Sequence, residues 1–119
     1  MSLFAQIGEE KLREIITEFY HRAFVDPIIA HFFFKHNHLH LIEQQFAFTA
    51  SMLGATHIDY QGKSLRTAHQ KIPLRNPHFS RRQVILAQVM DDLGLSESLK
   101  TQWLEKEEKL RPQIVHKII

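Results

Sequence analysis

Hydrophobic positions follow helical spacing along most of this chain. From residue 9 to residue 25 the apolar side chains recur at three- and four-residue steps, which predicts an amphipathic helix. Its apolar face is made by Leu12, Ile15, Ile16, Phe19, Ala23 and Phe24. A second helix is predicted over 39–53, with one side formed by Leu41, Gln44, Gln45, Phe48 and Met52. No segment alternates as a strand does, so the pattern predicts an all-α fold.

Two further short helices are predicted from turn signals. Asp26 followed by Pro27 ends the first helix and opens another over 27–33, with the aspartate as cap and the proline at the first helical position. Residues 55–63 are predicted to form a loop, and a short helix over 64–71 is expected before the next proline.

The second half of the chain is divided by the same kinds of signal. Gly54 ends the 39–53 helix, and Asn76-Pro77 is predicted to cap and open a helix that Gly94 ends. Ser96 is then predicted to cap a last helix of about twenty residues.

Composition narrows the class of protein. With 119 residues, the chain is expected to form one domain over 1–119. It has no cysteine, which excludes disulfides, iron–sulfur clusters and thiol catalysis. Its 15 basic and 13 acidic residues are mixed, so no nucleic-acid surface is indicated. The most apolar stretch, FAFTASMLGA, has about half the length of a membrane span, and a cytoplasmic protein is expected.

Histidines are the first candidates for chemistry. His36, His38 and His40 stand at two-residue spacing, which places their side chains on different sides of a helix. Such a tract either lies on the surface or binds a transition metal. The metal reading defines an alternative function, a helical interaction module that uses these three residues to bind zinc, nickel or copper and needs no organic cofactor.

A separate set of polar residues lies on apolar helix faces. His69 shares a face of the predicted 64–71 helix with Leu65 and Ile72, and is either a core residue or a metal ligand. Tyr20 points inward with its apolar neighbours, and Gln44 and Gln45 lie on the apolar side of theirs. Buried polar groups need partners, so these donors either satisfy one another or converge on a bound group. One inward histidine, aromatic walls and inward donors together meet the needs of haem.

Several segments, taken in order, resemble the truncated (two-over-two) haemoglobins, closest to group I. They are LFAQIG, EFYHRAFVDPIIAHFF, QQFAFTASMLGA, YQGKSLRTAH and PHFSRRQVILAQVMDDLGL, and they span nearly the whole chain. The helix predicted to end before Gly94 lacks a tryptophan, which argues against groups II and III. The resemblance implies a two-over-two helical sandwich around haem b.

The resemblance also implies roles for individual residues. His69 is expected to be the proximal iron ligand and Phe33 to stack on the haem, while Tyr20 and Gln45 are the expected distal donors and Leu41 occupies the usual distal histidine position. The expected apolar cage consists of Phe48, Leu53, Tyr60, Leu65, Leu74 and Phe79, and the residues expected on the propionate side are His40 and Gln44.

The chain departs from the family pattern at a few positions. The double glycines of the family appear as Gly8-Glu9 and Gly54-Ala55. Arg82 aligns with an apolar haem-side position. Two explanations fit: a register shift that turns Val84 or Ile85 toward the haem, or an arginine that reaches solvent. In the predicted 39–53 helix, a shift of the family alignment by one residue would make His40 a distal ligand of the iron.

The expected function follows from the resemblance. It implies a globin that binds dioxygen, nitric oxide and carbon monoxide, with slow dioxygen release because two donors face the ligand. Nitric oxide dioxygenation would need an external reductase, since the chain carries no reductase domain, and gas sensing would need a partner. A monomer or weak dimer with neither nucleic acid nor membrane as partner is expected.

Overall fold

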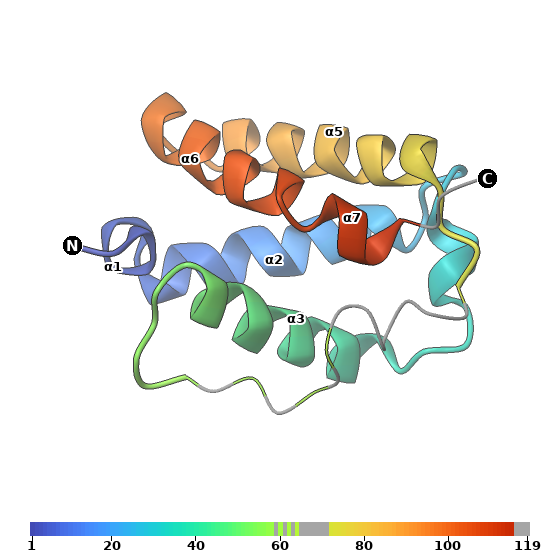
Figure 1. The fold of residues 1–119 in the computed structure, drawn as a ribbon, viewed down its shortest axis with the longest axis horizontal. Coiled ribbons are helices and arrows are strands. Elements are labelled where there is room, and N and C mark those ends of the chain that lie inside the picture. Colours follow the sequence, from blue (N-terminus) through green and yellow to red (C-terminus); the bar gives the residue numbers. More distant parts are fainter. Residues whose placement is uncertain (59, 61, 63, 65–71, 116–119) are drawn as a thin grey trace.

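The computed structural model describes residues 1–58, 60, 62, 64 and 72–115, and within them all regular secondary structure is helical. The elements are α1 (Leu3–Ile7), α2 (Glu9–Ala23), the 3-10 helix η1 (Ala30–Phe33), α3 (His38–Met52), α5 (Asn76–Asp92), α6 (Glu97–Glu108) and α7 (Arg111–Ile114), shown in Figure 1. The predicted helix over 64–71 lies largely outside the described residues.

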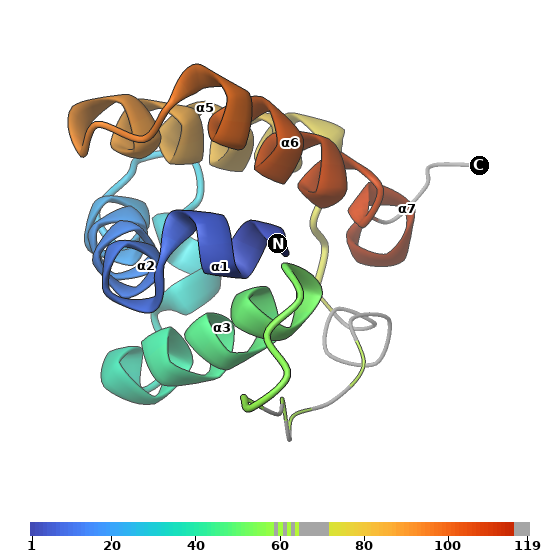
Figure 2. The same ribbon diagram turned by 90° about the vertical axis from the view of Figure 1, so that its left-hand side faces the viewer.

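Helix α2 is the centre of the arrangement. It packs against α5 on one side and against α3 on the other, with α6 beside α5, as Figures 1 and 2 show. The buried face of α2 is the apolar stripe that the sequence predicted, and it meets buried residues of both neighbours. From α3 these are Ile42, Phe46 and Ala50, and from α5 they are Ile85, Leu86, Val89 and Met90. The apolar stripe therefore orients α2 between two helical layers.

The predicted boundaries of the longest helices hold closely. The 9–25 helix is observed as Glu9–Ala23, and the 39–53 helix as His38–Met52. Gly54 follows α3 with a φ of 105°, and a Cβ there would lie 2.7 Å from the Ser2 side chain. Glycine is favoured at this position both by its backbone and by the close approach of the N-terminal segment.

Two local predictions are corrected by the structure, and one short helix was missed. Asp26 does accept backbone N–H groups, from Ile28 at 3.1 Å and Ile29 at 3.3 Å, but the following residues form turns and then the 3-10 helix η1 rather than an α-helix. The short helix α1 was not predicted. The cap of α5 is Arg75, and Asn76 is its first helical residue.

The predicted last helix of about twenty residues is also wrong. Ser96 caps it as expected, accepting from Leu99 N–H at 3.3 Å, but α6 ends at Glu108 and the chain turns before α7. The proline at position 112 explains the break, because it has no N–H to donate to the carbonyl four residues earlier. The turn redirects the C-terminal residues back over the start of α5 (Figure 1).

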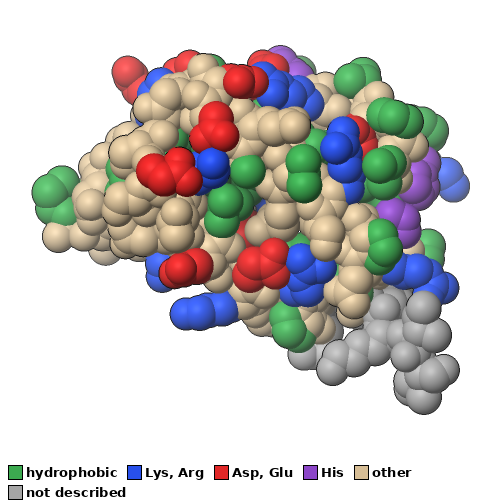
Figure 3. All heavy atoms as spheres, turned by 90° about the horizontal axis from the view of Figure 1, so that it is seen from above, with side chains coloured by type: hydrophobic (Ala, Val, Ile, Leu, Met, Phe, Trp, Pro, Cys, Tyr) green, Lys and Arg blue, Asp and Glu red, His purple; other side chains and the backbone are tan. Residues whose placement is uncertain are grey.

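The outer face of α5 and α6 carries both signs of charge. Figure 3 looks onto this face from above and shows acidic and basic side chains interspersed among apolar ones. This agrees with the mixed charge along the sequence. Within the described part of the chain, no helix has the length and apolar character needed to cross a bilayer.

A buried carboxylate ties the end of α2 to α5. Asp26 is 6 % exposed, and its Oδ1 accepts from Arg81 Nη2 at 2.7 Å and Nε at 3.1 Å. The Arg81 guanidinium is the main cause of a lowered pKa for the Asp26 carboxyl, and it outweighs the opposing effect of burial. The pair fixes the turn that leads into η1 and hence to the aromatic residues beside it.

We expect Asp26→Asn to lower the free energy of unfolding at neutral pH by about 1–2 kcal/mol, since one side of the pair is partly exposed. A carboxyl whose folded pKa lies below its unfolded value of about 3.9 contributes stability above that value and loses it as the pH falls through the folded pKa. The gap between wild type and variant should therefore shrink in acid. Urea unfolding at several pH values would measure it, and a gap that widened in acid would contradict the assignment.

Candidate functional site

One cavity of about 590 Å³ opens between the two helical layers. This volume lies within the range of sites that hold a small molecule or cofactor. Its walls come from α2, the segment around η1, α3, the start of α5 and the region where α6 passes into α7. Residues distant in sequence thus meet around one space, which is the candidate site.

Most of the predicted site residues that the structure describes lie on the walls of this cavity. They are Tyr20, Phe33, Leu41, Gln44, Gln45, Phe48, Tyr60, Leu74 and Phe79. Aromatic rings contact one another along the wall: Tyr20 and Phe33 meet edge to face at 5.9 Å between centroids, and Phe48 and Tyr60 at 5.2 Å. The apolar and aromatic character of the predicted pocket is therefore reproduced by the packing, while the role of each residue stays a prediction.

Two predicted residues lie elsewhere, and two lie outside the described residues. Leu53 is buried in the core between the helices, where its carbonyl accepts from Phe4 N–H at 2.9 Å. His40 is exposed in the first turn of α3 and does not line the cavity. Leu65 and His69 fall on residues that are not described.

The histidine tract is dispersed by the fold. His36 lines the cavity, whereas His38 stacks on Phe24 at 3.7 Å between centroids and its Nε2 lies 3.3 Å from the Phe33 carbonyl oxygen. Among the described residues, which include all three of these histidines, no group of three metal-ligating side chains is placed to hold an ion. The alternative metal cluster is thus not assembled.

The structure contradicts both explanations offered for Arg82. The side chain neither reaches freely into solvent nor gives way to a shifted register: it lines the cavity, while Val84 is 46 % exposed and Ile85 packs in the core. Arg82 lies on the buried face of α5, and its guanidinium carbon is 5.1 Å from the ring centroid of Phe19. Cations over an aromatic face in this way gain stabilisation.

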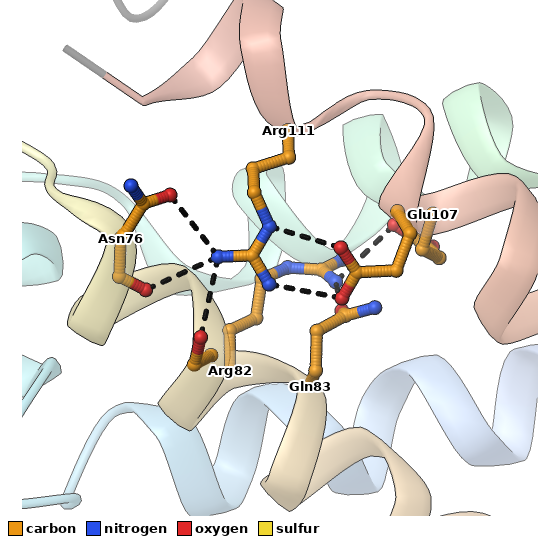
Figure 4. A network of polar contacts seen from close by, with 7 residues as sticks. Asn76, Arg82, Gln83, Glu107 and Arg111 are labelled. Carbon is orange, nitrogen blue, oxygen red and sulfur yellow. Dashed lines mark hydrogen bonds and ion pairs between the residues drawn. The ribbon is translucent and has the colours of Figure 1, made fainter. Parts of the chain in front are cut away.

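The partner of Arg82 is Glu107, which the sequence reasoning missed. Arg82 Nη1 lies 3.2 Å from Glu107 Oε2 and donates to Gln83 Oε1 at 2.7 Å, contacts drawn in Figure 4. Glu107 is only 3 % exposed, and its Oε1 accepts from Trp103 Nε1 at 3.0 Å. The carboxylate is therefore fixed on both oxygens by donors from two helices.

A sequence signal for this region did exist. Trp103, Glu107, Leu110 and Ile114 recur at helical spacing and share one face, so a carboxylate stood on an apolar stripe. Such a carboxylate requires a cationic partner. The last two residues of this stripe, together with Phe32 and His78, line the cavity and were not predicted to do so.

Tyr20 stands in the field of this ion pair. It is 5 % exposed, and burial raises the pKa of its hydroxyl to about 12, an effect that Arg82 opposes and Glu107 reinforces. The pKa of Arg82 is also raised, because its interactions with Glu107 and Tyr20 outweigh burial, which acts in the other direction. At neutral pH the Tyr20 hydroxyl is thus protonated and Arg82 is charged, so both are donors at the cavity wall.

Comparison with known proteins assigns the family. The model of the bacterial-like globin family matches residues 2–116. The chain belongs to this family, that of the truncated haemoglobins. It is 29 % identical to the group 1 truncated hemoglobin of Tetrahymena thermophila over 92 residues, which cover 77 % of this chain and 75 % of that protein. The family predicted from the sequence motifs is confirmed.

Solved structures confirm the truncated globin fold. The truncated hemoglobin of Tetrahymena pyriformis in its Fe(III) form is similar to this globin with a TM-score of 0.91 and 26 % identity, covering 98 % of this chain and all of that one. The 2/2 hemoglobin of Synechococcus sp. PCC 7002, at 21 % identity and a TM-score of 0.90 over 98 % of this chain and 100 % of that one, supports the fold alone.

The cavity of this globin fits the cofactor that its family implies. Haem is a large apolar disc, and aromatic and aliphatic side chains form most of the cavity wall. Protonated Tyr20 and charged Arg82 lie on the wall beside Phe19, and Glu107, the carboxylate partner of Arg82, lines the same cavity. Membership of the family implies that the chain binds haem and, through it, diatomic gases.

Proposed function

We propose that this globin holds haem b in the cavity through His69 and binds dioxygen, nitric oxide and carbon monoxide on the side of Tyr20. The observation that carries the proposal is the convergence of Tyr20, Gln45 and the aromatic wall on one space of suitable volume. When bound, the haem would supply the iron to which the gas binds. Phe33 and Phe48 would confine the disc.

Tyr20 and Gln45 are proposed to donate hydrogen bonds to the ligand. In the relative from Tetrahymena pyriformis, structures exist of variants with a tyrosine or either of two glutamines replaced. The intervals between those positions equal the intervals between Tyr20, Leu41 and Gln45 in this chain. Tyr20 and Gln45 thus preserve two of the three residue types, and Leu41 stands where that relative has a glutamine.

Absorption spectroscopy tests the proposal directly. The purified protein, supplied with haemin, should show a sharp Soret band that shifts when the reduced form is exposed to carbon monoxide. Failure to take up haemin would refute the proposal.

Replacing Tyr20 with phenylalanine should speed dioxygen dissociation roughly 10- to 100-fold, because a hydrogen bond to a charge-bearing acceptor contributes about 1.5–3 kcal/mol. Stopped-flow displacement of dioxygen by carbon monoxide would measure the rate. Carbon monoxide dissociation, from a ligand that carries little charge, is the internal control and should change much less. An unchanged dioxygen rate would remove Tyr20 from this role.

A role in chemistry or sensing suits this site better than transport. Two donors facing the ligand predict slow dioxygen release, which disfavours delivery. Nitric oxide dioxygenation to nitrate would then require an electron donor outside the described chain, and a cytoplasmic location would give access to one. Nitrate formation from nitric oxide by the oxygenated protein would test this activity.

A further inference from the structure

Arg82, Glu107 and Tyr20 come from three different helices and line one cavity. Arg82 belongs to α5, Glu107 to α6 and Tyr20 to α2. Among the described residues that line the cavity, Arg82 is the only arginine or lysine, and Glu107 is the only aspartate or glutamate. Charges in such a setting act strongly, because the effective dielectric around them is low.

The guanidinium of Arg82 has donors to spare. It carries five N–H groups, of which two belong to Nη1. Nη1 faces Gln83 Oε1 and Glu107 Oε2, the contacts seen in Figure 4. The other three N–H groups belong to Nε and Nη2, and they are the donors that the guanidinium can turn to a ligand in the cavity.

Glu107 holds the guanidinium in place and is itself held by a hydrogen bond. Trp103 holds one carboxylate oxygen and Arg82 approaches the other. Phe19 and Phe79 flank the guanidinium, with its carbon 5.1 Å and 5.7 Å from their ring centroids. A cation fixed by a carboxylate and two rings is a preorganised donor, which binds without paying to order a flexible side chain.

We propose that Arg82 is a third polar contact for the iron ligand, beside Tyr20 and Gln45, and that its positive charge, held in place by Glu107, makes the site favour small anionic ligands over neutral ones. The inference rests on the haem-binding function proposed above. The ligand class is a small inorganic anion able to coordinate ferric iron and to accept hydrogen bonds from a guanidinium and a phenol.

Azide is the anionic probe and carbon monoxide the neutral one. The variant Arg82→Met/Glu107→Leu removes both charges, so neither is left buried without a partner. Its ferric form should bind azide roughly tenfold or more weakly than wild type, as expected for loss of a charge-assisted contact, while carbon monoxide binding to its reduced form changes less than about threefold. Arg82→Lys, which keeps the charge, should retain much of the azide affinity.

Glu107→Gln should change the azide affinity in the opposite direction. The glutamine can still accept from Trp103, but Arg82 loses its counter-charge, so azide affinity should rise severalfold. A matched control is Lys100→Met, which removes a cation from another pair between α5 and α6, with Nζ 2.9 Å from Asp91 Oδ1, that does not line the cavity. This control should leave the ratio of azide to carbon monoxide affinity as in wild type.

A measurement without haem separates the possible failures. In a Tyr60→Phe background, alkaline titration of the phenol absorbance should show the pKa of Tyr20 falling when Glu107 becomes Gln, since Glu107 raises it. If wild type takes up haem but the double variant binds azide as well as wild type does, the inference is wrong and the proposed function stands. If wild type takes up no haem, both are overturned. A Tyr20 titration that does not respond to Glu107→Gln also counts against the inference, because the pair would not act on Tyr20.

Discussion

Replacing Glu107 with alanine is expected to lower the free energy of unfolding by about 3–5 kcal/mol, because it leaves the largely buried Arg82 without its counter-ion. Arg82 lines the cavity with 22 % of its side chain exposed, and Trp103 would lose the acceptor of its Nε1–H as well. Urea denaturation of the haem-free protein, followed by circular dichroism, would measure the change.

Two further variants test whether the loss of stability comes from the unpaired charge. Glu105→Ala removes an exposed glutamate from the same helix and should change the free energy of unfolding by less than about 0.5 kcal/mol. Arg82→Met/Glu107→Leu should recover the part of the lost stability that comes from the unpaired charge, because apolar side chains of similar volume can replace a buried ion pair at little cost, while Trp103 Nε1–H still lacks its acceptor. A loss below about 1 kcal/mol for Glu107→Ala would show that solvent compensates Arg82.

Replacing His69 with glycine is expected to abolish the normal haem spectrum. If His69 supplies the imidazole bond to iron, the variant should lose its Soret band or show it displaced after addition of haemin. Added imidazole should then restore a histidine-like spectrum by occupying the space left by the side chain. Absorption spectra of the oxidised, reduced and carbon monoxide forms would record these changes.

The control for His69→Gly is the same substitution at a histidine that does not line the cavity. His57 is exposed in the segment after α3, where its Nε2 lies 3.1 Å from Glu9 Oε1, and it does not line the cavity. His57→Gly should therefore take up haemin as wild type does. A His69→Gly protein with an unchanged spectrum would remove His69 from the role of ligand, and His36, which lines the cavity, would be the next residue to test.

Sequence motifs predicted the family, and the fold followed from it. The helices over 9–25 and 39–53 were located to within two residues because their apolar faces repeat locally. Asp26 does accept the backbone N–H groups that follow it, but it caps no helix, and η1 begins four residues later. Part of the cavity wall, including Tyr20, Phe33 and Gln45, was predicted from the same motifs. These features depend on residues close together in the chain or on a pattern shared by the family.

The tertiary structure alone decided the features that join separate helices. The family resemblance placed Arg82 at an apolar position, and Glu107 stands at helical spacing on an apolar stripe, but only the packing of α6 against α5 shows that each satisfies the other. The turn between α6 and α7 likewise brings the end of that stripe to the cavity, which a single predicted helix did not allow. The physical reason is that periodicity fixes which face of a helix is buried, whereas the partner that makes a buried charge tolerable comes from another part of the chain.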